Sequence, residues 1–188
     1  MSNPVLDAIR SRRMARALAD RPVGRDQLEE VLKAARWAPN AGNRRLHRFV
    51  AVQSPKTLAV LRMVSPGMFQ RPTAAVLICI DQRRVSAFGM RATAKSLLID
   101  VGTAAQTMLL AAHSLGLGAG IVTSFSQAAV REVLNLPEQL SPELFICLGY
   151  PSPAAPAGMR PRSPVTWQGL TDWERFPITG ATASTPSS

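Results

Sequence analysis

Two short arginine clusters are the residues of this chain best suited to bind a ligand. Arg12, Arg13 and Arg16 follow the first expected helix, and Arg160 and Arg162 lie in a proline-rich segment late in the chain. A guanidinium stays charged at any relevant pH, and its paired N–H groups match phosphate oxygens. Each cluster alone is more typical of a solvated basic surface. Together, in this order around a polar turn, they indicate a phosphate site.

The polar turn lies in "ARWAPNAGNRRLHRF", residues 35–49. An apolar helical repeat ends at Pro39, which cannot continue a helix. Two asparagines, a glycine, three arginines and a histidine follow before an apolar strand. A loop this polar and cationic predicts a ligand lying against it.

Several other chemistries find no support in the residues. His47 and His113 lie far apart and lack metal-like partners, so no metal site is expected. No Gly-x-Ser-x-Gly elbow and no Walker-type loop occurs. The glycines of "LGLGAG" follow a helix instead of a strand, so we interpret them as a helix end. Cys79 and Cys147 lie in apolar runs and are expected to be buried thiols in a reducing cytoplasm.

The charge of the chain raises one alternative. The net charge is +10, and residues 1–48 hold 11 Lys and Arg against 5 Asp and Glu. Such a surface can attract nucleic acid. However, zinc-finger spacing, an RNP-like aromatic strand and a basic zipper are all absent from the sequence. A specific nucleic-acid partner is therefore not expected.

Composition and patterning predict one globular domain. The chain has 188 residues, of which 46% are hydrophobic, and it contains no uninterrupted apolar run long enough for a transmembrane helix. No secretory signal pattern opens the chain, so a cytoplasmic protein is expected. We expect a single domain over residues 1–176 and a flexible tail over 177–188.

Helical and strand patterns alternate along the chain. Helices are expected from Pro4 to the first arginines, with Val5, Leu6 and Ile9 facing inward, and from Asp26 to the turn. Leu98, Val101 and Met108 belong to the apolar repeat of a long helix over 95–115, buried at the centre or in a subunit interface. Further helices are expected over 55–64 and 127–134, and strands over 48–53, 73–81, 120–125 and 144–150.

The order and spacing of four segments resemble the FMN-dependent nitroreductase-like flavoenzymes. These segments are "SRRMAR", "AARWAPNAGNRRLHRF", "AAHSLGLGAGIVTSF" with "AVREVLNLPE", and "LGYPSP…RPR". The resemblance covers residues 4–176. It implies an α+β fold, with a central, mostly antiparallel sheet wrapped by helices in an intertwined homodimer. It also implies one FMN in each of two interfacial pockets, and chain ends that wrap the partner subunit.

The resemblance also implies roles for individual positions. The FMN phosphate would be held by Arg12, Arg13, Arg160 and Arg162, and Arg16 would approach the pyrimidine edge of the flavin. The turn from the other subunit would touch the flavin through Pro39, Asn40, Ala41 and Asn43. Backbone N–H groups of Thr123 and Ser124 would approach flavin N5 and O4. The flavin would carry the chemistry, so no catalytic side chain is expected.

Some positions depart from the family pattern. Met14 stands where a serine is usual, so only its backbone could serve the phosphate. Arg45, Leu46 and His47 replace a common Gln-Pro-Trp, and Thr107 replaces an asparagine. The segment between the strand over 73–81 and the long helix is short, which predicts a reduced lid.

Two enzyme hypotheses and one remote alternative follow. The first is an oxidoreductase that transfers hydride from NADH or NADPH through FMN to a nitroaromatic, quinone or similar acceptor. The second is an FMN-dependent dehydrogenase or oxidase of a peptide-like or other biosynthetic substrate with oxygen as acceptor, because "SPGMFQRPTAAVLICID" resembles the branch of the cyclodipeptide oxidases. The remote alternative is a basic nucleic-acid-binding protein.

Overall fold

The structure is a computed structural model that describes residues 2–89, 95–152 and 166–175. The chain divides into two compact units, residues 1–156 and 157–188. The described part of the second unit contains one short helix, η2 (Gln168–Leu170). The elements of the first unit are α1 (Pro4–Ser11), β1 (Leu18–Ala19), α2 (Arg25–Ala35), η1 (Ala41–Asn43), β2 (His47–Val52), α3 (Pro55–Met63), β3 (Ala74–Asp81), α4 (Gln82–Ala87), α5 (Lys95–Ser114), β4 (Gly118–Val122), α6 (Gln127–Leu134) and β5 (Leu140–Pro151).

The strands form one antiparallel sheet. The strand order is β1-β5-β3-β2, and β4 also pairs with β5. Every strand pair of this sheet is antiparallel. An isolated parallel bridge, Met14 to Ala119, ties the segment after α1 to β4. The predicted α+β fold with a mostly antiparallel sheet is confirmed.

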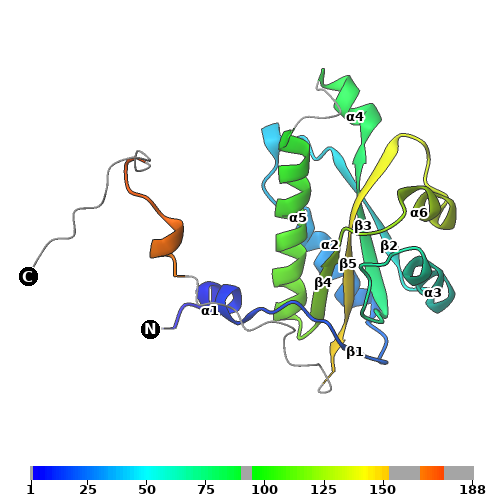
Figure 1. Ribbon diagram of the computed structural model, residues 1–188, viewed down its shortest axis with the longest axis horizontal. Coiled ribbons are helices and arrows are strands. Elements are labelled where there is room, and N and C mark those ends of the chain that lie inside the picture. Colours follow the sequence, from blue (N-terminus) through cyan, green and yellow to red (C-terminus); the bar gives the residue numbers. More distant parts are fainter. Residues whose placement is uncertain (1, 90–94, 153–165, 176–188) are drawn as a thin grey trace, which may run out of the picture. The chain divides into compact units, whose positions relative to one another are not determined.

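Helices cover both faces of the sheet. Figure 1 shows α2 and α5 on one side of the strands and α3 and α6 on the other. Along β3, Val76 and Ile78 join the core beneath α2 and α5, whereas Leu77 joins the core beneath α3 and α6. A strand buried on both faces needs no polar alternation, which explains the continuous apolar run of "AAVLICI". Each such side chain contributes about 1.5–3 kcal/mol by leaving water.

The long helix α5 is buried along one stripe only. Val101, Ala105, Met108 and Leu109 face the core, as predicted. Leu98 was assigned to this stripe, but it is 60% exposed, and Leu97 is buried in its place. The helical repeat therefore begins one residue earlier than the sequence pattern suggested.

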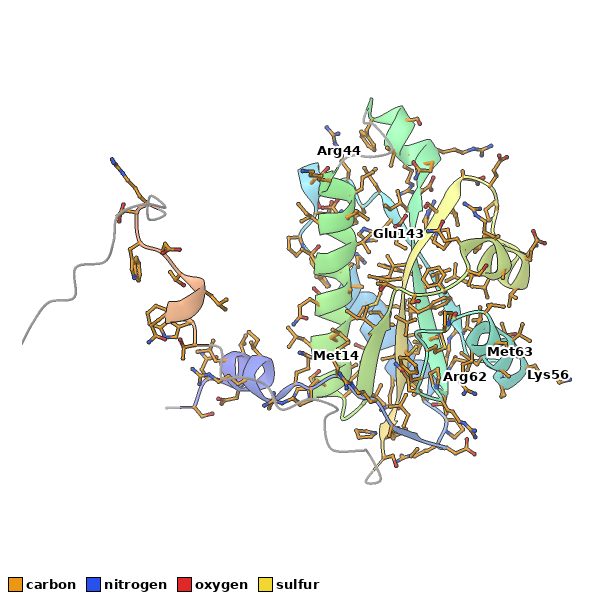
Figure 2. The ribbon with its side chains drawn as sticks, in the orientation of Figure 1. Met14, Arg44, Lys56, Arg62, Met63 and Glu143 are labelled. Atoms are coloured by element: carbon orange, nitrogen blue, oxygen red, sulfur yellow. The ribbon has the colours of Figure 1, made fainter. Side chains whose placement is uncertain are left out.

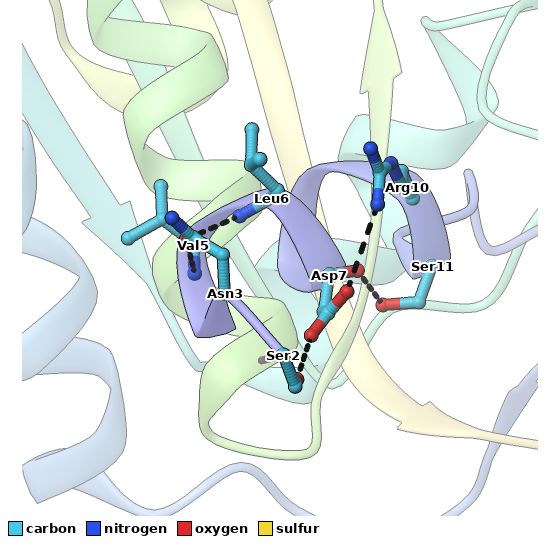
Figure 3. Close-up of polar contacts among 7 residues, drawn as sticks. All are labelled: Ser2, Asn3, Val5, Leu6, Asp7, Arg10 and Ser11. Atoms are coloured by element: carbon cyan, nitrogen blue, oxygen red, sulfur yellow. Dashed lines mark hydrogen bonds and ion pairs between the residues drawn. The ribbon is translucent and has the colours of Figure 1, made fainter.

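Helix α1 contributes nothing to the core. Its start is capped by Asn3, whose Oδ1 accepts hydrogen bonds from the N–H groups of Val5 (3.1 Å) and Leu6 (3.2 Å) (Figure 3). The prediction that its apolar residues face inward is wrong: Val5, Leu6 and Ile9 are 65%, 44% and 49% exposed. A helix of two turns is marginal in water without packing. Its apolar face is therefore exposed in this chain.

Several element boundaries differ from the prediction. Strand β4 begins at Gly118, inside the segment interpreted as a helix end, and it stops before Thr123. Only Gly116, with φ of +71°, adopts the left-handed conformation that ends α5. Helix α4 and the two-residue β1 were not predicted, because short elements carry little periodic signal. In the described part of the chain, no helix is both long and apolar enough to cross a membrane.

Candidate functional site

Arg12 sits at the end of α1 with part of its guanidinium buried. The Arg12 N–H donates to the Ala8 carbonyl and ends the helix. Within the described residues, the buried Nη1 of Arg12 has no hydrogen-bond partner. A buried charged donor without an acceptor is costly, because it has lost its water. This atom is therefore a candidate donor to a bound anion.

Arg13 and Arg16 are both exposed. The Nη1 of Arg13 donates to the carbonyl oxygens of Arg10 and Arg12, the latter at 3.0 Å. The Arg13 guanidinium therefore lies against the carbonyl oxygens at the end of α1. A phosphate would compete with those carbonyls for Arg13, so Arg12 is the better placed of the two.

The backbone after Arg13 runs closely along β4. The Ala15 N–H donates to the Ala119 carbonyl at 2.8 Å. A Cβ on Gly118 would lie 2.8 Å from the Ala15 Cβ, and one on Gly120 would lie 3.0 Å from the Ala15 carbonyl oxygen. Both glycines are thus required by the close approach of this segment, which places Met14 and Arg16 at the edge of β4.

The asparagine turn is anchored to α5. The carboxylate Oδ1 of Asp100 accepts the Ala41 N–H at 2.9 Å, and the Thr103 hydroxyl donates to the Pro39 carbonyl at 2.7 Å. Inside the turn, Asn40 Oδ1 accepts the Arg45 N–H at 2.9 Å. Two of these hydrogen bonds attach the turn to α5, and the third closes the turn on itself.

Left-handed backbone makes the turn compact. Gly42 (φ +61°), Asn43 (φ +55°) and Arg45 (φ +49°) all adopt this conformation. It is easy for glycine and tolerated by asparagine, but unfavourable for arginine. The bonds to Asp100 and Thr103 therefore hold a backbone that the local sequence alone would not favour. The side chain of Asn43 is exposed at the apex.

Thr123 and Ser124 follow β4 directly, and both are exposed. The loop between α3 and β3 packs beside them: the Gly67 N–H donates to the Ser124 carbonyl at 3.0 Å. Gln70, which is buried, reaches over the strand, so a Cβ on Gly120 would lie 2.6 Å from its Nε2. The segment "SPGMFQ", residues 65–70, therefore packs against the end of β4 and the two residues that follow it.

Within one chain, the two halves of the predicted site lie apart. The asparagine turn contacts α5 at Asp100, whereas Ser11 Oγ lies 2.9 Å from His113 Nε2 near the other end of that helix. At about 1.5 Å of rise per residue, Asp100 and His113 are roughly 20 Å apart along the helix axis. In Figure 2, Met14 lies near one end of α5 and Arg44 near the other. The structure brings the arginine segment to β4 but does not bring the turn to it.

Buried titratable groups offer no ready nucleophile. Burial raises the pKa of Cys79 and of Cys147 to about 12, so both stay protonated thiols. Burial also lowers the pKa of His47, although the nearby Asp100 charge opposes this shift. The Nδ1 of His47 and the Oδ2 of Asp100 both lack hydrogen-bond partners among the described residues. Metal-like clusters are likewise missing from that part of the chain.

Asp100, Thr103 and Gln70 are site residues that sequence reasoning missed. The signal for Asp100 was a single acidic residue in the otherwise apolar "LLIDVGTAA". Buried carboxylates are rare unless they hold a partner. Thr107, which replaces the usual asparagine, donates to the Thr103 carbonyl of its own helix at 2.8 Å.

Comparison with known proteins decides the family. The nitroreductase family model matches residues 9–72 and 66–150. The chain belongs to the nitroreductase family. A Bacillus subtilis relative named FMN reductase [NAD(P)H] is 30% identical over 180 residues, which cover 86% of this chain and 71% of the relative.

Solved structures of the nitroreductase family share the fold. A family member from Clostridium difficile superposes with a TM-score of 0.78 at 28% identity, over 94% of this chain and 100% of the other. A Desulfovibrio desulfuricans protein, solved in complex with FMN, gives a TM-score of 0.76 at 28% identity with the same coverage. The resemblance stated from the four sequence segments is confirmed.

The residues of this chain fit a phosphate-bearing cofactor. The buried Nη1 of Arg12 has no acceptor among the described residues, and the bare Cα atoms of Gly118 and Gly120 let the backbone of 14–16 approach β4. Arg160 and Arg162 lie outside the described residues. The assignment of individual residues to FMN stays a prediction.

Proposed function

We propose that this protein is an FMN-dependent oxidoreductase that transfers hydride from NADH or NADPH to a nitroaromatic, quinone or similar small acceptor. The observation that carries the proposal is the buried Nη1 of Arg12, which has no partner among the described residues and lies two residues before the segment that runs along the glycines of β4. The FMN reductase relative and the FMN-bound neighbour support the choice of cofactor. Cytoplasmic location is part of the proposal, because two buried free thiols suit a reducing compartment.

FMN, when bound, supplies hydride acceptance and donation between the nicotinamide and the acceptor. The protein supplies binding and orientation. Arg12 would hold the phosphate of FMN, and the fixed positive charge of Arg16 would balance negative charge on the pyrimidine edge of the flavin. The backbone at Thr123 and Ser124 would orient the ring, which needs only N–H groups and no acidic or basic side chain.

We propose further that the site is shared between two copies of the chain. The asparagine turn and the Arg12 segment lie near opposite ends of α5, so a second subunit is the natural source of the missing half. Exposed apolar side chains on α1 and α5 support an interface there; they are Val5, Leu6, Ile9, Leu98 and Ile99. In the second unit, Trp167, Leu170 and Trp173 are also exposed, which suits docking onto a partner subunit.

Two measurements test the function. The purified protein is expected to be yellow and to release FMN on denaturation, and NADH or NADPH added without oxygen should bleach it. A nitroaromatic or quinone should then restore the colour. Bleaching by a peptide-like substrate and by neither nicotinamide would favour the oxidase alternative. A colourless protein that takes up no FMN would contradict both enzyme hypotheses.

A further inference from the structure

The Arg44 side chain packs against two neighbours at the rim of the asparagine turn. A Cβ on Gly42 would lie 3.0 Å from Arg44 Nε, so the side chain folds back over the bare glycine. On its other side, the Arg44 guanidinium carbon lies 4.7 Å from the centre of the Phe88 ring, at the end of α4. A guanidinium fixed against a ring keeps its N–H edges free for an in-plane acceptor. Figure 2 shows Arg44 between the start of α5 and α4.

The surroundings of Arg44 are strongly cationic. The side-chain Nη1 of Arg84 donates to the Arg45 carbonyl at 3.2 Å, and the Nε of Arg45 donates to the Arg36 carbonyl at 3.3 Å. These bonds join α4, the turn and the end of α2 into one surface. Six arginines belong to it: Arg36, Arg44, Arg45, Arg48, Arg83 and Arg84.

Carboxylates balance only part of this charge. Asp81 pairs with Arg48 at 3.3 Å and with Arg84 at 3.7 Å. The other nearby carboxylate, Asp100, is buried behind the turn. Arg36, Arg44 and Arg83 are exposed, and no described carboxylate lies within ion-pair distance of them. These three residues are named here the free arginines.

We propose that the free arginines bind the phosphates of the nicotinamide donor, and that Arg44 selects NADPH through its 2′-phosphate. The inference rests on the proposed function, because it takes the adjacent turn to lie against the flavin. A dinucleotide whose nicotinamide stacks on that ring must carry its phosphates across the rim of the site. An arginine beside the ribose is a known solution for recognising the 2′-phosphate, which NADH lacks. Guanidinium also binds phosphate with two parallel hydrogen bonds.

A dinucleotide fits these observations better than an acidic protein would. The Arg44 side chain folds over Gly42 and stacks on Phe88, a defined arrangement of the kind expected for a group that meets one small ligand. Broad attraction of an acidic partner would need no such fixed side chain. The NADPH preference therefore depends on Arg44 more than on total charge.

Steady-state kinetics with the FMN-loaded protein test the proposal. The wild type should show a higher kcat/KM with NADPH than with NADH. Arg44→Ala should lower kcat/KM for NADPH by roughly tenfold, the size of one charge-assisted hydrogen bond, and lower that for NADH much less. Arg25→Ala is the matched control, since Arg25 is exposed and pairs with Glu29 on α2. It should leave the ratio of the two values unchanged.

Two further variants keep the test decisive if Arg44→Ala folds poorly. Arg83→Ala removes an exposed charge on α4 and should lower the NADPH preference by a few-fold, more so at low ionic strength. Arg44→Lys retains the charge but not the planar fork, and should recover only part of the preference. Equal use of NADH and NADPH, or equal losses for both in Arg44→Ala, would overturn the inference and leave the proposed function standing. If neither NADH nor NADPH bleaches the protein, the proposed function itself would instead be contradicted.

Discussion

Part of the Arg12 guanidinium has no hydrogen-bond acceptor in the described part of the chain. Its Nη1 is buried and has no acceptor there, whereas the neighbouring Arg13 donates to the carbonyl oxygens of Arg10 and Arg12 at the end of α1. In the folded protein, Arg12 is therefore the better candidate of the two adjacent arginines to bind an anion. Sequence alone treated the two as equivalent.

Arg12→Ala should weaken FMN binding by about 1.5–3 kcal/mol, the range for a hydrogen bond to a charged group. Titration of the apoprotein with FMN, followed by fluorescence, measures the change. Arg25→Ala removes the same charge from an exposed site on α2 and should change the affinity little. Equal effects of the two substitutions would mean that only general surface charge attracts FMN.

At the scale of the element, α5 sets the conformation of the asparagine turn. Asp100 is 5% exposed, and its Oδ2 has no partner in the described residues. Burial of a carboxylate that has one oxygen without a partner lowers the stability of the folded protein. The benefit is the bond from Asp100 Oδ1 to the Ala41 N–H, which holds a backbone with three left-handed residues.

Asp100→Ala removes this acceptor and should weaken FMN binding by about 1–3 kcal/mol, because the Ala41 N–H is left without a partner. Asp100→Asn keeps an acceptor oxygen, so it should retain most of the affinity while the protein becomes more stable through loss of a buried charge. FMN titration and thermal unfolding separate the two effects. If alanine and asparagine weaken FMN binding equally, the carboxylate does more than position the turn.

At the scale of the whole molecule, cofactor binding and assembly should be coupled. Ligand that binds only the dimer stabilises the dimer by mass action. Ile9→Asp on α1 should therefore shift the protein toward monomer and reduce its FMN content together. Val60→Asp is the matched control, because Val60 is an exposed apolar residue on α3. Sedimentation velocity with absorbance in the visible range reports both quantities. A monomer with full FMN occupancy would contradict the shared site.

The order of the main elements could be predicted because their periodicity is local. The apolar run of β3 and the helical repeat of α5 follow directly from the sequence, and two buried thiols were correctly assigned. Boundaries were less certain: β4 starts at Gly118, where glycines suggested a helix end. Sheet pairing with β5 determines that boundary, and pairing involves residues far apart in sequence.

The sequence by itself determined the family and the fold class and named the candidate site segments, because these depend on residue types in a fixed order. Only the tertiary structure decided that Arg12, and not Arg13, has a buried guanidinium nitrogen without a partner among the described residues, and that Asp100 anchors the asparagine turn. The tertiary structure also showed that α1 turns its apolar face outward, where the sequence predicted a face toward the core. Helical spacing defines an apolar stripe, but it carries no information about which surface covers that stripe. Whether a side chain is buried, and which hydrogen-bond partner it has, depends on elements that meet only in the folded chain.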